Sequence, residues 1–495
     1  MLDRRTLLAS TAALPLAAAP LGAHAQRAKT AVVLGMTLEP VGLDPTAAAA
    51  SSIAEVTLYN VYETLTKINA DGSVTPLLAE GWEVSPDLKT TTWRLKKGVT
   101  FQNGEPFDAQ AVKFSFERAA GDKSTNKDRR TFQNLTVQVV DPHTVVLLHK
   151  EIDPDIPFLL GQATAIIVEP KSADTNTTKP VGTGPYRLEA FNRGASLVLV
   201  AWEGYRTPAA ARIRRATFRF ISDQAAQAAA LLSGDVDAFA RFAPRGVPQF
   251  KANPRFQVLV GGSRAKTIVA INHRRKPLDD LRVRRAILAA IDRRAMVEGA
   301  ADGYGVPIGS HYVPGAPGYV DTTGINAFDL AKAKALLAEA GVKTPLELAV
   351  TLPPTPYARQ GGEVLAAQLA KVGIVCKLQN VEWAQWLSGT YGNKQYDLSI
   401  ISHVEPFDLG NYAKPDYYWG YQNKAFDALY DRIRTAPVAA DRLRLLGDAQ
   451  RLLATDAANG FLYQPQWVTV ANKNLKGLWK DMPIFVNELA ALQWT

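Results

Sequence analysis

Residues 93–118 read WRLKKGVTFQNGEPFDAQAVKFSFER, and along them the hydrophobic pattern changes from that of a strand to that of a helix. The segment TTTWRLKKGV (90–99) alternates polar and apolar residues, as a half-buried β-strand does. Apolar residues then recur at helical spacing from 107 to 119, and Asp108 stands where an N-cap is favourable. A strand followed closely by a capped helix predicts a mixed α+β unit.

The neighbouring sequence extends this α+β unit in both directions. Asp71-Gly72 is a turn signal before it, and residues 136–150 after it predict a β-hairpin around an Asp-Pro step. We therefore expect one α+β subdomain over residues 67–180.

The sequence outside the subdomain has α/β character. Gly182 and Gly184 flank Thr183 where a strand must begin tightly, and Gly234 stops a helix that separates later strands. Further on, residues 346–379 read strand, helix, strand, which predicts a parallel βαβ unit. The chain therefore contains two α/β regions interrupted by an α+β insertion.

Two helices are expected within the second α/β region. Residues 281–300 predict one long helix with apolar residues facing inward, and its arginines are expected to form a solvated or salt-bridged face. A shorter helix should begin at a capping Asp329 and end at Gly341.

The N-terminal 25 residues predict a cleavable signal peptide. Arg4 and Arg5 precede an apolar run that ends at Ala23-His24-Ala25, an A-x-A cleavage pattern. The paired arginines favour the twin-arginine export route, and a Sec signal is the alternative. No cysteine follows the cleavage site, so we expect a periplasmic protein without a lipid anchor.

Composition and motifs give little support for a nucleic-acid-binding protein or an enzyme. The formal charge of +9 is dispersed, and no basic-aromatic module appears. The motifs H-E-x-x-H, C-x-x-C and G-x-S-x-G are missing, and GGSRAKT (261–267) lacks a glycine of the phosphate loop. No two histidines stand at i, i+4, so neither a cofactor nor a locally encoded metal site is expected. A site assembled from distant residues stays open.

An ordered set of motifs over almost the whole chain after residue 25 carries a family resemblance. These motifs are GLDPT (42–46), LYNVYETL (58–65), DGSVTPLLAEGWEVSPDL (71–88), residues 93–118, VGTGPYRL (181–188), AINHRRKPLDDLRVRRAILAAIDR (270–293) and FDLAKAKALLAEAG (328–341). In this order they resemble the extracytoplasmic solute-binding proteins of peptide-type ABC importers, the dipeptide/oligopeptide-binding family (solute-binding family 5).

The resemblance implies a two-lobed, type II-like periplasmic-binding-protein fold of the α/β class with an inserted α+β subdomain. Domain I would comprise 26–63, 182–265 and 476–495, domain II 64–181, and domain III 266–475. The implied function is capture of a peptide or peptide-like solute between domains I and III by hinge closure. The implied protein is a monomer without catalytic activity that delivers its solute to an ABC permease in the inner membrane.

The loop SHVEPFDLGNY (402–412) is where the sequence departs from the family's peptide binders. In those proteins an aspartate of this region pairs with the α-amino group of the ligand, in a Trp-x-x-Asp context. Here His403 falls at the tryptophan and Pro406 at the amine-pairing position. Glu405 or Asp408 could substitute, and together they predict a cationic or amine-bearing group nearby.

Aromatic residues in the second α/β region are candidates to line the cleft, although core packing is an open interpretation of each. They are Trp383, Trp386, Tyr412, Tyr417, Tyr418 and Trp419. Two alternatives remain at the sequence level. The same scaffold could bind a nickel chelate, an opine or another non-peptide solute, with His403 and His311 as metal ligands in the nickel case. An exported metal-dependent hydrolase would use His403, Glu405, Asp408 and His311.

Overall fold

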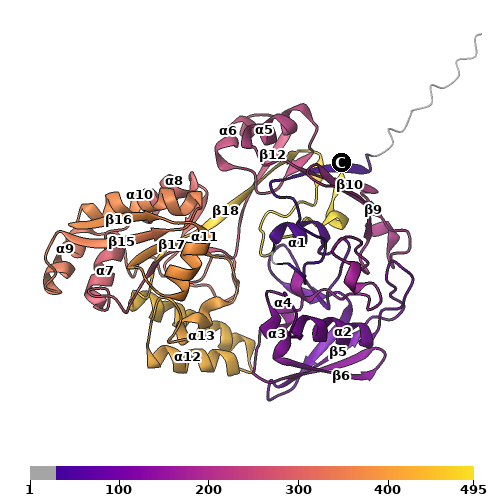
Figure 1. Ribbon diagram of the computed structural model, residues 1–495, viewed down its shortest axis with the longest axis horizontal. Helices are drawn as coiled ribbons and strands as arrows, with labels where there is room; N and C mark the ends of the chain where they lie inside the picture. The colour runs from indigo at the N-terminus through magenta and orange to yellow at the C-terminus, as the bar shows by residue number, and fades with distance from the viewer. Residues whose placement is uncertain (1–28, 49) are drawn as a thin grey trace, which may run out of the picture.

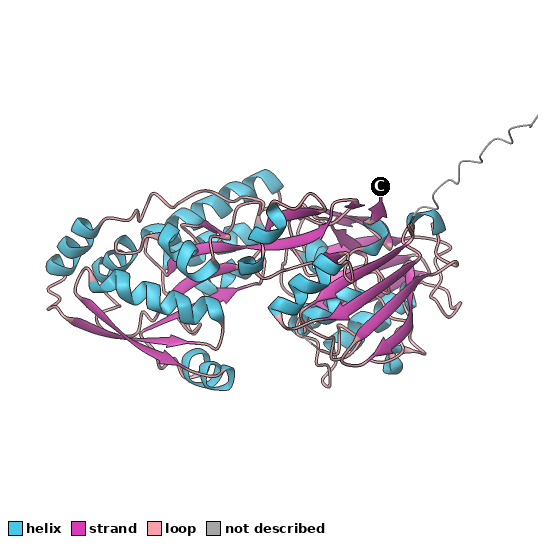
Figure 2. Cartoon of the chain, turned by 90° about the horizontal axis from the view of Figure 1, so that it is seen from above, coloured by secondary structure: helices cyan, strands magenta, loops and turns pink. Residues whose placement is uncertain are grey.

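The computed structural model describes residues 29–48 and 50–495. The predicted signal peptide, residues 1–25, lies outside the described residues. Two lobes lie side by side and are joined by strands, above all by the long strand β18 (Gly460–Asn472) (Figures 1 and 2). In the described part of the chain, no helix has the length and apolar character needed to cross a membrane.

A single twelve-stranded sheet in the described residues extends through both lobes. Its main path runs β16-β15-β17-β13-β18-β11-β1-β10-β9-β8. Near its start, β18 pairs with β13 (Lys266–Ile271) and β14 (Gly305–Pro307). Further along, it pairs with β11 (Ala238–Phe239) and β12 (Phe256–Gly262). The shared strand therefore couples the two lobes through backbone hydrogen bonds.

The first lobe is built around β1 (Ala31–Met36), which is parallel to β10 and β11. Glycine ends helix α5 as predicted, because Gly234 adopts a left-handed conformation with φ of +86°. The remaining elements of this lobe are α1 (Ser51–Thr57), β8 (Tyr186–Asn192), β9 (Ser196–Ala201), β10 (Arg215–Phe220), α5 (Gln224–Ser233), α6 (Pro248–Lys251), β19 (Leu475–Lys476) and β20 (Gln493–Trp494).

The predicted α+β insertion is confirmed as a separate antiparallel sheet of order β4-β5-β7-β6. Asp108 caps α2, accepting from the backbone N–H groups of Gln110 and Ala111. The insertion lies beside α12 and α13 of the second lobe (Figure 1). Its elements are β2 (Thr66–Ile68), β3 (Val74–Pro76), β4 (Ala79–Val84), β5 (Thr90–Leu95), α2 (Ala109–Ala120), α3 (Arg129–Gln133), β6 (Leu135–Asp141), β7 (Thr144–His149) and α4 (Ile156–Leu159).

The second lobe contains the predicted parallel βαβ unit, in which β15 and β16 pair in parallel around α10. The single helix predicted over 281–300 is wrong. The chain forms two helices, because the side chain of Asp292 accepts from the N–H groups of Arg294 and Ala295 and starts a new helix. The elements are α7 (Leu281–Ala289), α8 (Arg293–Ala301), α9 (Leu330–Glu339), β15 (Leu346–Leu352), α10 (Pro356–Ala370), β16 (Ile374–Asn380), α11 (Trp383–Gln385), β17 (Leu398–His403), α12 (Lys424–Thr435) and α13 (Ala439–Thr455).

Two arginines of this helical region are buried rather than solvated. Arg284 donates to the carbonyl oxygens of Leu278 and Ala457, and Arg293 donates to that of Phe461. Both side chains thus satisfy backbone acceptors at loop ends, a role that spacing along one helix does not reveal.

A tight backbone crossing and a buried ion pair hold together the two first-lobe segments at which the chain enters and leaves the insertion. A Cβ added to Gly182 would lie 2.0 Å from the carbonyl oxygen of Val61. Next to this crossing, the carboxylate of Glu63 accepts from Arg206 at 2.6 and 2.7 Å and from Thr183 at 2.9 Å. The predicted tight start at Gly182 is therefore a packing requirement.

Replacing Gly182 with alanine should destabilise the protein by about 1–3 kcal/mol or more, since the new methyl group meets backbone that cannot move aside. Gly81→Ala is the matched control, because a Cβ at Gly81 has no atom within 4 Å. Urea-unfolding midpoints of both variants provide the measurement. A Gly182→Ala protein as stable as Gly81→Ala would contradict the crossing described here.

Candidate ligand-binding cleft

Three adjoining cavities separate the second lobe from the insertion and the first lobe. Their volumes are about 690, 250 and 410 Å³, and the two larger ones fall within the range that suits small-molecule sites. The largest lies between residues 130–159 of the insertion and residues 407–446 of the second lobe. It shares Tyr312 and Phe407 with the middle cavity, which in turn shares Arg264 with the third. The cavities therefore form one interlobe row.

Side chains from both sides meet along this row. The rings of Phe158 and Phe407 pack edge to face with centroids 4.8 Å apart. Arg442 donates to Asp155 at 2.5 Å. Burial raises the pKa of Asp155 to about 6 although Arg442 opposes the shift, so the pair carries opposite charges at pH 7. These contacts connect the second lobe to the insertion across the cleft.

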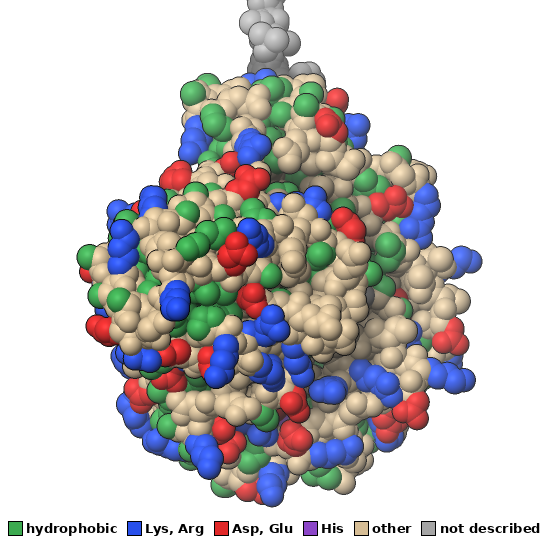
Figure 3. Space-filling model, turned by 60° about the vertical axis from the view of Figure 1, so that its left-hand side comes forward, with side chains coloured by type: hydrophobic (Ala, Val, Ile, Leu, Met, Phe, Trp, Pro, Cys, Tyr) green, Lys and Arg blue, Asp and Glu red, His purple; other side chains and the backbone are tan. Residues whose placement is uncertain are grey.

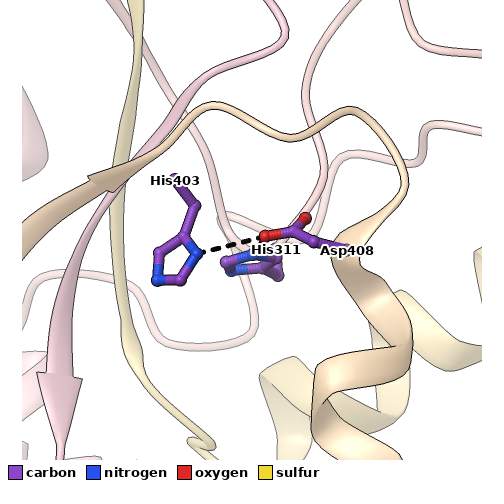
Figure 4. A group of neighbouring side chains, drawn as sticks. All are labelled: His311, His403 and Asp408. Carbon is purple, nitrogen blue, oxygen red and sulfur yellow. Dashed lines mark hydrogen bonds and ion pairs between the residues drawn. The ribbon is translucent and has the colours of Figure 1, made fainter. Parts of the chain in front are cut away.

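The loop singled out from sequence contains a buried charge cluster centred on Asp408. Its Oδ1 accepts from the ammonium of Lys266 at 2.7 Å. Its Oδ2 lies 2.8 Å from Nε2 of His311 and 3.2 Å from Nδ1 of His403. Figure 4 shows the three side chains close together. The side chains of Lys266, His311 and Asp408 are at most 5% exposed. Asp408 therefore already has a cation inside the protein.

The hydrogen bonds of this cluster are satisfied without an added ion. Burial by itself would raise the pKa of Asp408, but His311, the Lys266 ammonium and the hydrogen bonds from both imidazoles hold that pKa well below the usual value. An ionised carboxylate only accepts, so both imidazoles must present an N–H to it. Their other ring nitrogens then accept from the hydroxyls of Tyr412 and Tyr418, at 3.1 and 3.0 Å.

His311, His403 and Asp408 have the residue types and the spacing of a metal-binding group. Lys266 makes the fit poor, because a divalent cation there would lie beside a buried ammonium and break both imidazole–carboxylate hydrogen bonds. Burial lowers the pKa of His311 to about 4, so at neutral pH Lys266 is the cation that balances Asp408. The geometry is that of an internal ion pair supported by hydrogen bonds from two imidazole rings.

The structure distributes the aromatic candidates between the lobe core and its surface. Tyr412, Tyr418 and Trp419 are at most 1% exposed, and Tyr412 stacks on Trp419 with centroids 4.4 Å apart. Trp386 is buried as well, Tyr417 is half-buried, and Trp383 is 41% exposed. The cluster around His311 and His403 is thus walled by aromatic rings.

Glu405 differs from Asp408 although only two residues separate them. It is exposed, and its carboxylate accepts from the N–H of Val404 at 3.2 Å. Of the two acidic residues in the loop, Glu405 is the one exposed to solvent, whereas Asp408 is buried and lines the largest cavity while it pairs with Lys266.

Sequence reasoning missed Lys266, the cation of the cluster. The one available signal is a lysine at the head of β13, a strand whose six residues are all buried. Its partner stands 142 residues further along the chain, so local spacing could not identify the pair.

Replacing Asp408 with asparagine should cost about 3–5 kcal/mol of unfolding free energy, because it leaves the Lys266 ammonium buried without an anion. The double variant Lys266→Met/Asp408→Leu removes both charges and should lose less. Glu405→Gln is the control and should stay within about 0.5 kcal/mol. Urea unfolding of ligand-free proteins measures all three. A double variant less stable than Asp408→Asn would contradict the ion-pair account.

This chain is similar to known solute-binding proteins along most of its length. A di/tripeptide-binding protein of Pseudomonas aeruginosa is 27% identical, over 94% of this chain and 96% of the relative. A glutathione-binding protein of Salmonella paratyphi A is 28% identical, over 90% of each. A solved HbpA2 structure from Haemophilus parasuis has the same fold, with a TM-score of 0.85 at 21% identity over 94% of this chain and 100% of that one.

The two-lobed fold, the interlobe cavities and the motif order all point to the same group of proteins. The sequence profile described as bacterial extracellular solute-binding proteins, family 5 (middle region), matches residues 73–426, well over half of the chain. This chain belongs to the bacterial extracellular solute-binding proteins of family 5.

Proposed function

We propose that this protein captures a peptide or a peptide-like small solute between its lobes and delivers it to an ABC permease in the inner membrane. The row of cavities between the lobes is the observation that carries the proposal. Relatives named for binding di- and tripeptides or glutathione support the solute class. The protein acts as a binding component without catalytic chemistry of its own.

Hinge closure would act at the strands that connect the lobes. The chain crosses between β12 and β13 through residues 263–265, and crosses again within β18. A solute held from both sides favours the closed form, because an open cleft satisfies only one side of it. To change the ratio of closed to open protein from 1:99 to 99:1, the solute must bind the closed form about 5.5 kcal/mol more strongly than the open form.

The domain boundaries that go with this hinge remain those proposed from sequence. Domain I comprises 26–63, 182–265 and 476–495, domain II 64–181, and domain III 266–475. Separate hydrophobic cores in the insertion and in the second lobe support the division. The end of β18 is the exception, because Val468, Val470 and Ala471 pack in cores of the first lobe.

We further propose that the exported protein is a periplasmic monomer without a lipid anchor. The support is the sequence of residues 1–25, with its twin-arginine pattern and A-x-A cleavage site, and the absence of a cysteine just after that site.

A non-peptide solute is the second candidate on the same scaffold. Solved proteins of this fold include one in complex with agropinic acid and one in complex with Ni(L-His). The poor fit of the His311–His403–Asp408 group to a divalent cation favours an organic solute over a nickel chelate. It also disfavours the metal-dependent hydrolase considered from sequence.

Protein stripped of bound solute by unfolding and refolding should gain thermal stability with its solute class. We expect a rise in melting temperature with di- or tripeptides or glutathione, and none with nickel chelates, because mass action stabilises only the form that binds. Differential scanning fluorimetry against peptides, glutathione, opines and nickel chelates is the measurement. The absence of any shift, together with no solute in mass spectra of the unstripped protein, would defeat the proposal.

Glu405 should receive the amine of a peptide ligand, since Asp408 already pairs with Lys266. Glu405→Gln is expected to weaken binding of free-amine peptides about 5- to 10-fold and to leave N-acetylated peptides unaffected. Glu347→Gln, an exposed carboxylate on β15 that pairs with Lys377, is the matched control. Isothermal titration calorimetry measures these affinities. Equal affinities of the wild type, Glu405→Gln and Glu347→Gln for free-amine peptides would show that Glu405 does not contact the amine.

A further inference from the structure

Arg264 is a buried cation without a partner among the described residues. It lies in the link between β12 and β13, where the chain passes from one lobe to the other. The residue is 8% exposed, and its guanidinium forms no hydrogen bond or ion pair within residues 29–48 and 50–495. It lines both the middle cavity and the third cavity of the interlobe row.

The guanidinium contacts the turn of the β2–β3 hairpin across the cleft. A Cβ added to Gly72 would lie 2.1 Å from its Nη2 atom, so Gly72 provides the space that the guanidinium occupies. Gly72 belongs to the insertion, whereas Arg264 belongs to the link between the lobes. The cation is therefore held between two parts of the molecule that bound the cavities.

Two carboxylates lie near Arg264, but each accepts from a backbone N–H. Asp71 accepts from Ser73 at 2.8 Å, and Asp481 accepts from Gly262 at 2.7 Å. Burial lowers the pKa of Arg264, and both carboxylates oppose this shift although neither forms an ion pair with the guanidinium. The other charges that line these two cavities are Asp155 and Arg442, which pair with each other.

A guanidinium that is 8% exposed and unpaired is costly, because the cavities it lines give its five donors only limited access to water. A carboxylate is its best partner, since two parallel N–H···O bonds match the planar fork. A phosphate dianion suits the place less well, because Asp71 and Asp481 would repel its second charge. The surroundings of Arg264 thus favour a singly charged, planar anion.

We propose that Arg264 binds a carboxylate of the captured solute, which would make the connection between the lobes part of the binding site. This assignment rests on the proposed function of solute capture. It extends the binding site beyond the loop 402–412, because it places recognition of the anion on the link between the lobes. Glu405 is then the residue of that loop which would receive an amine. The competing account is that Arg264 only supports the hairpin turn by packing against Gly72.

The test uses tripeptide mixtures that differ only at the C-terminus, free acid against amide, titrated calorimetrically into stripped protein. The wild type should bind the acids about 10- to 100-fold more tightly than the amides. Arg264→Gln should lose that difference, and Arg264→Lys should keep part of it, since a point charge replaces the fork. Arg245→Gln, an exposed arginine that pairs with Asp302 outside the cavities, is the control and should behave as the wild type.

The stability of ligand-free protein distinguishes two roles of Arg264, binding of a solute carboxylate and support of the hairpin turn at Gly72. Ligand-free Arg264→Met should melt no lower than the wild type, because it removes an unpaired buried charge, whereas a supporting role requires it to melt lower. Equal binding of acids and amides by the wild type, or an unchanged ratio in Arg264→Gln, overturns the assignment and leaves solute capture intact. No binding of any peptide or other solute by the wild type defeats solute capture and the assignment together.

Discussion

The ion pair between Lys266 and Asp408 is the constraint on which the second lobe's side of the cleft depends. It ties the first residue of β13, next to the link between the lobes, to the loop that follows β17. A buried pair of this kind repays its desolvation only when further hydrogen bonds complete it. His311, His403, Tyr412 and Tyr418 provide them. These buried interactions fix the position of the loop. As a result Phe407, next to Asp408, packs against Phe158 across the cleft.

The same pair decides how charge is distributed along the cleft. Asp408 lines the largest cavity, but its charge is balanced inside the protein by Lys266, which leaves Glu405 as the unpaired and solvent-exposed acidic residue of this loop. At the strand link the situation is reversed, because Arg264 is buried and has no protein anion bound to it. Interspersed positive and negative side chains cover the visible outer face in Figure 3, with no single-sign patch that would steer one class of ligand. Selectivity is therefore expected from individual groups in the cleft rather than from the overall charge of +9.

Local sequence signals predicted the elements that depend on neighbouring residues. Asp108 caps its helix, and the βαβ unit at 346–379 forms as expected. The prediction for 281–300 was wrong because apolar periodicity continues through Asp292, while the cap it forms starts a second helix. The buried cluster was beyond sequence reasoning for a different reason. His311 and Asp408 are 97 residues apart and Lys266 and Asp408 are 142 apart, so only the crossing of strands brings them together. Arg264 also depends on contacts between distant parts of the chain, with Gly72 nearly 200 residues before it. In the sequence it stood out only as part of GGSRAKT (261–267), which does not match a phosphate loop.

A crystal structure of the protein purified with its own solute tests the central claim most directly. We expect closed lobes with the solute in the interlobe row of cavities, a solute carboxylate on the guanidinium of Arg264, and the Lys266–Asp408 pair intact. A solute whose ammonium binds Asp408 in place of Lys266, or a metal ion held by His311, His403 and Asp408, would contradict it.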